Sequence, residues 1–382
     1  MPDADPSIRP ALVHAERLEH YSFGEGHPMG PGRVSSALAL SRHLGLLDAF
    51  DVVDPPDAAD DLLTLVHTPD YLAAIRSGLA APRYGLGDAD NPVTAGLDRV
   101  AAGVVGASVE AARLVWSGQT HRALNVSGGL HHAQPAATSG FCVLNDAAVA
   151  IRWLLNAGAE RVAYLDLDAH HGDGVQSVFW NEPRVLTLSL HESPLHLFPH
   201  TGFPHETGGP AAQGRTANVA LPPGTADEPW LRALAFVAPP LLAAFRPQVL
   251  VTQHGADAHR RDTLTHLALS MDGLAAAWRH ARDLAERFAG GRWVALGGGG
   301  YDLDSVARAW THLVATVADA GLDLATRTPP GWLGGRGSAT LGDGRASDLA
   351  GYEPGAELHD WPDPPVVATS RKVFRHWGLE PW

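Results

Sequence analysis

The sequence predicts an α/β fold: a central parallel sheet flanked by helices, with the functional residues at the carboxyl ends of the strands. Short apolar runs alternate with longer segments of helical spacing, and clusters of polar residues directly follow the apolar runs. Nearly continuous apolar runs are typical of parallel strands that are covered on both faces. In such sheets ligands bind beyond the carboxyl ends of the strands, which is where the polar clusters fall.

Five apolar runs predict strands, because each is short enough to cross a buried sheet. They span residues 121–127, 161–168, 184–190, 248–253 and 292–296. The segments with helical spacing are residues 97–117, 143–158, 228–245, 271–289 and 303–320. Strands that alternate with helices predict right-handed crossovers and hence a parallel sheet. From about residue 326 the chain is rich in Gly, Pro and Trp, which predicts irregular structure packed on the same domain.

Composition and charge exclude several classes of function. The chain has 382 residues, 45% of them hydrophobic, which suffices for a large buried core. A formal net charge of −14 argues against nucleic-acid binding, because such proteins need a basic face. The single cysteine, Cys142, excludes an internal disulfide framework and predicts a reducing, cytoplasmic location. Residues 1–5 do not resemble a secretory signal, and no apolar run could span a bilayer, so we expect no membrane association.

Carboxylates and a histidine cluster at the end of the second apolar run. Alternate residues along a strand share a face, so we expect the side chains of Asp166, Asp168 and His170 to point the same way. Such a cluster costs repulsion and lost solvation unless a cation compensates. We expect Asp168 and His170 to ligate a metal, with Asp257 from the end of the fourth run as the third ligand. Two aspartates and one histidine with open positions suit catalytic zinc.

A structural aspartate and a dinuclear site are the alternatives to a single zinc ion. An aspartate at a strand end often caps the following turn, but the polar residues at 170–173 in the same loop favour a metal site. Dinuclear manganese ureohydrolases use an Asp-x-His-x-Asp loop whose last carboxylate bridges both metals. Counted from Asp168, that position is Gly172, so the sequence favours one metal.

Two adjacent histidines and a tyrosine supply groups for proton transfer. His131 and His132 follow two glycines, and a loop is needed for both to face one substrate. Attack of a metal-activated water on an amide needs a base and an acid, and two imidazoles with different carboxylate partners can divide these roles. Asp166 and Asp173 are the available partners. Tyr301 ends a run of four glycines, and its phenol can donate to a developing oxyanion.

Each of these features has a plainer interpretation when taken alone. A His-His pair is often two ordinary loop histidines, and a glycine run can cradle a phosphate. The glycine run here lacks the Gly-x-x-x-x-Gly-Lys-Ser/Thr pattern of a phosphate loop. The catalytic interpretation therefore depends on the combination of the three polar clusters.

Taken together, the motifs resemble the histone deacetylase family, and most closely its bacterial acetoin-utilisation deacetylase branch. The matching motifs, in the family's order, are at residues 20–21, 26–29, 128–133, 139–141, 166–176, 189–191, 198–199, 255–259 and 297–301. The resemblance implies a single domain with an arginase-like α/β fold. It implies a deacetylase domain over residues 1–325, with residues 326–382 as an irregular C-terminal extension packed on it.

The resemblance also implies a role for each candidate catalytic residue. One zinc ion would bind Asp168, His170 and Asp257. The proton-transfer pair, its two supporting carboxylates and the tyrosine that polarises the substrate carbonyl would be His131, His132, Asp166, Asp173 and Tyr301. A structural potassium ion would bind backbone oxygens and one hydroxyl group, from Asp166, Asp168, His170, Leu190 and Ser189.

Substrate-binding residues are implied in the same way. Phe141, which follows Gly140, and Phe198 resemble the walls of a narrow tunnel that holds a lysine stem. Core packing is the alternative for both phenylalanines. Asp90 matches a rim carboxylate that grips the backbone amides of the substrate. Leu264 lies where some polyamine-selective relatives carry a glutamate, which favours acetyl-lysine over an acetylpolyamine.

The sequence therefore predicts a zinc-dependent hydrolase that acts on N6-acetyl-lysine in proteins. The nearest alternative is an acetylpolyamine or other small acyl-amine, which the acidic composition leaves open. A non-catalytic acyl-lysine-binding module is disfavoured, because the expected metal ligands and Tyr301 are all present. His200 replaces a common glycine near the rim, where it can change substrate preference.

Overall fold

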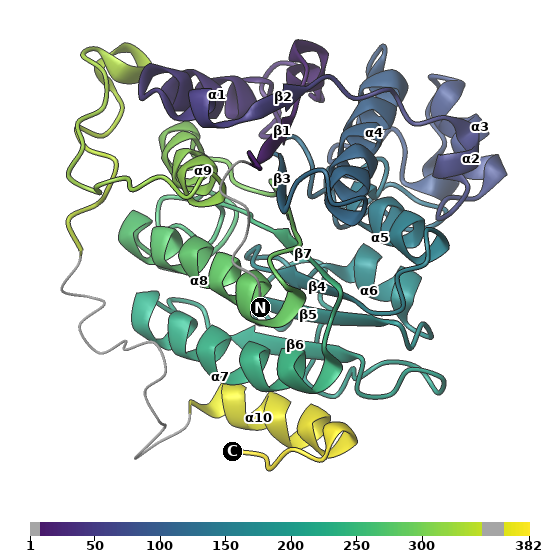
Figure 1. Cartoon of the computed structure of the whole chain (residues 1–382). Helices are drawn as coiled ribbons and strands as arrows, with labels where there is room; N and C mark the ends of the chain where they lie inside the picture. The colour runs from purple at the N-terminus through teal and green to yellow at the C-terminus, as the bar shows by residue number, and fades with distance from the viewer. Residues whose placement is uncertain (1–7, 346–362) are drawn as a thin grey trace.

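A computed structural model describes residues 8–345 and 363–382 (Figure 1). Residues 1–5 and the part of the expected extension at 346–362 lie outside the described residues. Eight strands form one sheet in which every pairing is parallel, in the order β2-β1-β3-β8-β7-β4-β5-β6. The strands are β1 (Ala11–Val13), β2 (Asp51–Val53), β3 (Arg122–Asn125), β4 (Val162–Asp166), β5 (Val185–Glu192), β6 (Thr216–Leu221), β7 (Val249–Gln253) and β8 (Trp293–Leu296).

Helices cover both faces of this sheet (Figure 1). The described α-helices are α1 (Gly32–His43), α2 (Asp60–Leu63), α3 (Pro69–Arg76), α4 (Leu97–Trp116), α5 (Asp146–Asn156), α6 (Asp173–Phe179), α7 (Asp227–Phe245), α8 (Met271–Ala289), α9 (Leu303–Val317) and α10 (Pro364–Val373). One hydrophobic core lies between the sheet and α1, α7, α8, α9 and α10, and a second lies under α2 to α6. None of the described helices is long and apolar enough to cross a membrane.

Strand β4 illustrates how the two cores use one continuous apolar run. Ala163 and Leu165 belong to the core under α7 to α9, whereas Val162 and Tyr164 belong to the core under α4 and α5. Alternate residues point to opposite faces, so a strand that is covered on both faces needs apolar side chains at every position. The same rule explains why the predicted strands read as unbroken apolar runs.

The predicted α/β fold with a parallel central sheet is confirmed. All five predicted strands and all five predicted helices form, with ends shifted by a few residues. The five strands are consecutive neighbours in the sheet, as β3, β8, β7, β4 and β5, so their carboxyl ends share one edge. The polar clusters that follow them are therefore brought together.

The structure also contains strands that the sequence analysis did not predict. Strands β1 and β2 have three residues each, which is too short to produce a recognisable apolar run. Strand β6 begins with one polar residue, Thr216, and contains another, Asn218, although both are buried. Short strands and buried polar side chains both weaken the apolar signal on which the prediction depends.

The expectation of irregular structure in the extension is wrong for its last part. Residues 364–373 form α10, which begins directly after Asp363. Its first residue is a proline, which is favourable at the first helical position because no intrahelical donor is lost there. Val366 and Val373 face the core, and the Thr369 hydroxyl donates to the carbonyl oxygen of Asn218 on the edge strand β6 (2.6 Å).

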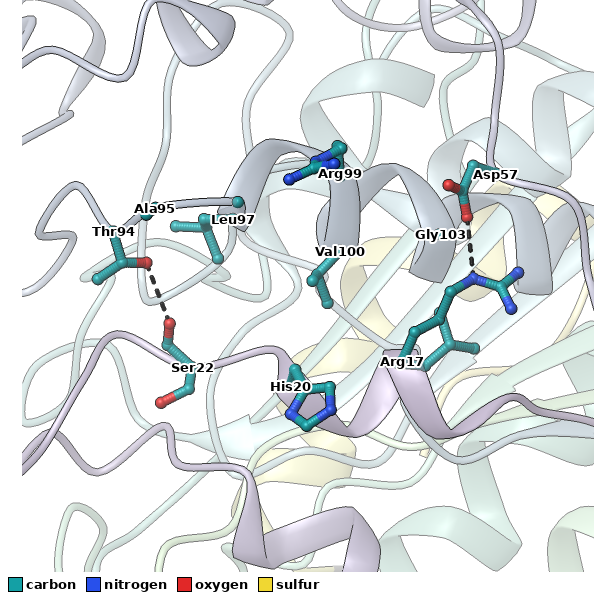
Figure 2. Close-up of a pocket in the computed structure, with 12 residues that line it drawn as sticks. Arg17, His20, Ser22, Asp57, Thr94, Ala95, Leu97, Arg99, Val100 and Gly103 are labelled. Atoms are coloured by element: carbon teal, nitrogen blue, oxygen red, sulfur yellow. Dashed lines mark hydrogen bonds and ion pairs between the residues drawn. The ribbon is translucent and has the colours of Figure 1, made fainter.

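A surface cavity of about 340 Å³ lies beside the start of α4 (Figure 2). Arg17 and Asp57, which line it, are hydrogen bonded to each other (Nε to Oδ1, 3.2 Å). The Thr94 hydroxyl donates to the carbonyl oxygen of Ser22 across the cavity wall (3.2 Å). None of the lining residues is a predicted metal ligand or catalytic residue, so the candidate site lies elsewhere, at the carboxyl ends of the strands.

Candidate metal and catalytic site

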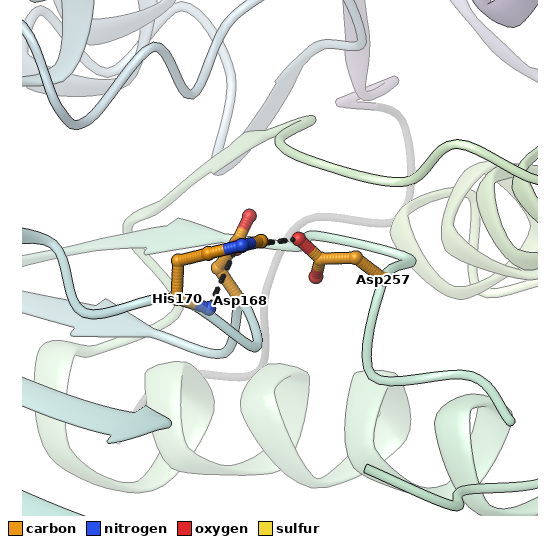
Figure 3. A group of neighbouring side chains, drawn as sticks. All are labelled: Asp168, His170 and Asp257. Atoms are coloured by element: carbon orange, nitrogen blue, oxygen red, sulfur yellow. Dashed lines mark hydrogen bonds and ion pairs between the residues drawn. The ribbon is translucent and has the colours of Figure 1, made fainter. Parts of the chain in front are cut away.

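Three predicted metal ligands converge at the centre of the sheet edge (Figure 3). Asp168 and His170 lie in the loop after β4, and Asp257 lies in the loop after β7. Their potential ligand atoms are all within 4.8 Å of one another, and all three residues are buried. His170 Nδ1 is 3.1 Å from Asp168 Oδ1 and 3.0 Å from Asp257 Oδ2.

Strand alternation, which was expected to bring these side chains together, does not do so. Strand β4 ends at Asp166, so Asp168 and His170 are not carried to one side by strand alternation. Hydrogen bonds shape the loop instead: the Asp168 backbone N–H donates to Asp166 Oδ1 (3.2 Å), and the Ala169 N–H donates to Asp257 Oδ1 (2.9 Å). The loop is thus folded around the carboxylates themselves.

The two ligand carboxylates are held by further donors and by close backbone approach. Asp168 Oδ2 accepts hydrogen bonds from Gln253 Nε2 (2.6 Å) and from the Gly299 backbone N–H (2.8 Å). A Cβ at Gly299 would lie 2.2 Å from Asp257 Oδ2, so a glycine is required for the backbone to come this close. This contact gives a structural reason for part of the glycine run before Tyr301.

The electrostatics of the cluster fit a bound cation. Burial and the charge of Asp168 raise the pKa of Asp257 to about 8. Burial opposes a charge on His170, but the two carboxylates outweigh it and raise the pKa of this imidazole to about 10. Two buried carboxylates this close need positive charge nearby, which a proton on His170 supplies and a divalent cation would replace. The donor set, two carboxylates and one imidazole, is one that such cations accept.

The two adjacent histidines each have their own carboxylate. His131 Nδ1 is 2.8 Å from Asp166 Oδ2, and His132 Nδ1 is 2.6 Å from Asp173 Oδ1. The two Nε2 atoms face each other at 3.1 Å. Asp166 and Asp173 are thus where the sequence analysis expected orienting partners, and each fixes the position of one imidazole ring. His131 Nε2 also lies 3.9 Å from Asp168 Oδ1, which places the pair beside the metal ligands.

Opposite pKa shifts separate the two imidazoles. Burial disfavours the charge on His131, but Asp166 and Asp168 outweigh it and raise its pKa to about 9. Burial and the nearby charge of His131 lower the pKa of His132 to about 4. The two imidazoles therefore differ in their affinity for a proton, which is the property that divided acid and base roles need.

Sequence reasoning missed the buried aspartate that shapes the histidine turn. Asp146, in the first turn of α5, accepts hydrogen bonds from the backbone N–H groups of Gly129 (3.0 Å) and Leu130 (2.7 Å). The Ser108 hydroxyl also donates to it (2.5 Å). An acidic residue in the first turn of an otherwise apolar helix is a weak signal, because most such residues only favour the helix dipole.

Tyr301 lies beside the cluster and is half-buried. Its backbone N–H donates to Asp262 Oδ2 (2.7 Å), and its ring meets the Phe141 ring edge to face, with centroids 5.7 Å apart. Burial raises the pKa of Tyr301 well above its ordinary value, against the opposing charge of Arg33. The phenol therefore keeps its proton and can act as a hydrogen-bond donor.

Arg33 is a second buried residue that sequence reasoning missed. Its Nε donates to the carbonyl oxygen of Gly300 (2.7 Å), and another guanidinium N–H donates to the carbonyl oxygen of Gly298. The guanidinium also lies 5.4 Å from the centroid of the Tyr301 ring. A single arginine in a helical segment gives no signal from sequence alone, because most arginines are solvated.

The two predicted tunnel walls contact different catalytic groups, Phe198 at His132 and Phe141 at Tyr301. The Phe198 ring centroid is 5.1 Å from that of His132, and 41% of the residue is exposed, which excludes core packing for Phe198. Phe141 is half-buried between Tyr301 and His27. A Cβ at Gly140 would lie 2.4 Å from His132 Cδ2 and 2.9 Å from Phe198 Cε1, so only a glycine leaves this space open.

The remaining predicted residues lie around this centre. Asp90 is exposed, and its carbonyl oxygen is 3.1 Å from His27 Nε2. Leu264 is half-buried, and its backbone N–H donates to Asp262 Oδ1 (2.9 Å). Ser189 pairs with Asp166 in the register of β4 and β5. Leu190 follows Ser189 on β5, so the residues predicted to hold potassium are neighbours.

A comparison with protein families matches the histone deacetylase domain over residues 27–317. The chain belongs to the histone deacetylase family. It is 40% identical over 330 residues to the acetoin utilization protein AcuC of Bacillus subtilis (strain 168), covering 84% of this chain and 85% of that protein. It is 36% identical over 321 residues to AcuC of Staphylococcus aureus (strain MSSA476), covering 82% of each.

Solved structures of histone deacetylase homologues have the same fold. A crystal structure of an HDAC homologue from Aquifex aeolicus superposes with a TM-score of 0.76 at 30% sequence identity, covering 84% of this chain and 86% of that one. An HDAC homologue complexed with SAHA superposes with a TM-score of 0.75 at 30% identity. The predicted family is thus confirmed, and family membership supports deacetylase activity at a metal-dependent site.

Proposed function

We propose that this histone deacetylase family member hydrolyses N6-acetyl-lysine in proteins, using one zinc ion bound by Asp168, His170 and Asp257. The observation that carries the proposal is the convergence of these buried ligand groups beside two imidazoles that each have a separate carboxylate. Metal-dependent amide hydrolysis needs all of these parts within reach of one substrate atom.

The donor set favours a single zinc ion. Two carboxylates and one imidazole leave positions open for substrate and water, as in catalytic zinc sites. When bound, such an ion would polarise the scissile carbonyl and lower the pKa of a water molecule. A second, bridging carboxylate could not occupy position 172, because even a Cβ at Gly172 would lie 2.2 Å from Asp166 Oδ2. This contact argues against a dinuclear centre.

The chain's own residues supply the proton transfers and the orientation of the substrate. We assign the two proton transfers to His131 and His132: one imidazole accepts a proton from the attacking water, and one donates a proton to the departing amine. Asp166 and Asp173 hold the two rings in the orientation that these transfers need. The Tyr301 phenol donates a hydrogen bond to the carbonyl oxygen, where negative charge develops.

The substrate would enter between Phe141 and Phe198, whose rings enclose the unbranched lysine stem. Asp90 would accept hydrogen bonds from backbone amides of the substrate; in support, it is exposed, and its backbone carbonyl contacts His27, which packs on Phe141. Leu264 would contribute an uncharged part of the entrance. A structural potassium ion would bind the backbone oxygens of Asp166, Asp168, His170 and Leu190 and the Ser189 hydroxyl. The single cysteine suits a reducing cytoplasm.

A small acylated polyamine is the second candidate substrate. The net charge of −14 and the exposed carboxylate of Asp90 favour a cationic molecule near the entrance. Such a molecule would gain no ion pair at Leu264. The ratio of kcat/KM for an acetyl-lysine peptide to kcat/KM for acetylspermidine separates the two candidates.

The proposal is tested with purified protein and a fluorogenic acetyl-lysine peptide, before and after treatment with a chelator. We expect hydrolysis to stop when the metal is removed and to return when zinc is added back. Activity that persists without metal would contradict the proposal. Zinc binding without hydrolysis of the peptide, but with hydrolysis of acetylspermidine, would favour the second candidate.

A further inference from the structure

The C-terminal segment at residues 338–343 returns to the catalytic edge and places the Asp343 carboxylate beside the loop that carries Asp257. The Asp343 side chain is 10% exposed. Its Oδ2 accepts hydrogen bonds from His259 Nε2 (2.9 Å), Arg260 Nη2 (2.7 Å) and the Met271 backbone N–H (3.0 Å). Its Oδ1 accepts one from a buried arginine, Arg308 (Nη1, 2.8 Å). This carboxylate is therefore fully engaged, although it lies beyond the family-matched residues 27–317.

The loop at residues 257–262 connects the third metal ligand with the tyrosine. It begins at Asp257 and ends at Asp262, whose Oδ2 accepts a hydrogen bond from the Tyr301 backbone N–H (2.7 Å). His259 is in the middle of this loop and is completely buried. A shift of His259 therefore moves both ends of the loop, and hence both a metal ligand and the oxyanion donor.

His259 is held from both ring nitrogens. Its Nε2 donates to Asp343, and its Nδ1 is 2.9 Å from the Ser305 hydroxyl and 3.3 Å from the Arg261 backbone nitrogen. Nδ1 accepts the hydrogen bond from the Arg261 backbone N–H, so the ring proton is on Nε2, where a carboxylate is the best partner. Asp343 thus fixes the orientation of the ring as well as its position.

A second carboxylate ties the same loop to the same C-terminal segment. Arg261 pairs with Asp304 on α9 (3.0 Å), and Asp304 also accepts hydrogen bonds from the Ser338 hydroxyl (2.6 Å) and backbone N–H (3.0 Å). Arg308, which is 0% exposed, bridges Asp304 and Asp343. The loop, α9 and the C-terminal segment thus form one hydrogen-bonded unit.

We propose that Asp343 is a positioning residue, which acts through His259 to hold Asp257 and Tyr301 in their working arrangement. The inference rests on the proposed function of this site. Groups that orient metal ligands typically change metal affinity or activity by roughly 10- to 100-fold when they are removed. Small displacements of reacting groups have effects of similar size on turnover. The C-terminal segment is accordingly part of the catalytic unit, in addition to stabilising the fold.

The experiment compares Asp343→Asn with Asp363→Asn in the full chain. Both aspartates hold C-terminal residues on the core through an arginine; Asp363 makes a two-point ion pair with Arg232 on α7 (2.9 and 3.1 Å). The zinc dissociation constant is measured by competition with a chromophoric chelator, together with kcat, KM and the melting temperature. Asp363→Asn therefore controls for loosening of the C-terminal residues alone.

We expect Asp343→Asn to raise the zinc dissociation constant about tenfold and to lower kcat about tenfold, with KM changed less than about twofold. Asp363→Asn should leave both constants unchanged, whatever it does to the melting temperature. If Asp343→Asn changes only the melting temperature, Asp343 is structural and the inference is wrong.

His259→Asn tests the same link from the other end, and it also serves if Asp343→Asn yields no folded protein. Asparagine keeps an acceptor for the Arg261 backbone N–H, but its shorter side chain places no donor where Nε2 meets Asp343. It should reproduce the defects of Asp343→Asn, and the double variant should be no worse than either single variant. Additive effects would overturn the inference. If the unaltered protein binds zinc but hydrolyses no acyl amide, the proposed function fails, while the dissociation constants still decide the role of Asp343.

Discussion

The floor and the entrance of the candidate site differ in how strongly their side chains are constrained. The floor consists of the predicted metal ligands and catalytic groups, and the entrance consists of the predicted substrate-binding residues around them. On the floor, Asp168 and Asp257 are completely buried, and each contacts His170 and accepts hydrogen bonds from the backbone. At the entrance, Phe198 is 41% exposed and Asp90 is also exposed. A buried charge without partners is costly, so the floor tolerates little change, whereas exposed side chains are only lightly constrained. We therefore expect the floor to determine the reaction and the entrance to determine which substrate reaches it.

The largest effect is expected from changing a ligand on the floor. Asp257→Asn should abolish tight zinc binding and lower kcat/KM on the order of 10³-fold or more, because a charged ligand is lost. It should not destabilise the metal-free protein, because asparagine resembles the protonated carboxyl that burial and the charge of Asp168 favour. Zinc-dependent changes in melting temperature measure both expectations. A variant that still binds zinc tightly would remove Asp257 from the ligand set.

The next largest effect is expected from groups on the floor that do not bind metal. Tyr301→Phe and His132→Ala should each lower kcat by roughly 10²- to 10³-fold, the usual loss for an oxyanion donor or a proton-transfer group. Zinc content, measured by atomic absorption, should stay near that of the unaltered protein. Full turnover in either variant would exclude that residue from the mechanism.

A buried histidine outside the floor affects the stability of the fold and not the reaction. His254 lies between Trp278 and Trp293, and its Nε2 has no hydrogen-bond partner among the described residues. Burial lowers its pKa to about 3. Below its ordinary pKa of about 6.5, the unfolded chain binds a proton that the folded chain does not, so stability is present above that pH and is lost as the pH falls.

The loss from His254 should be about 1.4 kcal/mol per pH unit between about pH 6.5 and the folded-state pKa. Chemical denaturation at pH 7 and pH 5 measures it. His254→Gln should show a weaker dependence on pH over this interval, because glutamine does not titrate. An equal slope in both proteins would assign the acid sensitivity to other groups.

The smallest effect is expected at the entrance. Asp90→Asn should raise KM for an acetyl-lysine peptide about three- to tenfold and leave kcat nearly unchanged, because an exposed hydrogen-bonding carboxylate contributes about 1 kcal/mol to binding. KM for a small acetylated amine without peptide bonds should not change. A large fall in kcat would mean that Asp90 contributes to the floor as well.

The floor could be predicted from sequence because its residues occur in short motifs and these motifs lie at strand ends. Asp168 and His170 are two residues apart, and the order of strands brings Asp257 to them. What could not be predicted are contacts between distant segments that follow from packing. Arg33 reaches Gly298 and Gly300 from α1, and Asp343 reaches His259 from the C-terminal segment.

The same limit applies to the fold. The long apolar helices and strands were predictable, whereas β1 and β2, with three residues each, carry too little pattern. Helix α10 was hidden by the prolines and glycines around it, because such composition predicts irregular structure. Its position depends on pairing with residues more than a hundred positions away, including the bond from Thr369 to Asn218.

Zinc titration of the metal-free protein, with acetate release from an acetyl-lysine peptide as the readout, tests the central claim most directly. A single site formed by Asp168, His170 and Asp257 predicts that activity rises linearly with added zinc and reaches its maximum at one equivalent per chain. A maximum that requires two equivalents, or binding of zinc without any return of activity, would contradict the claim.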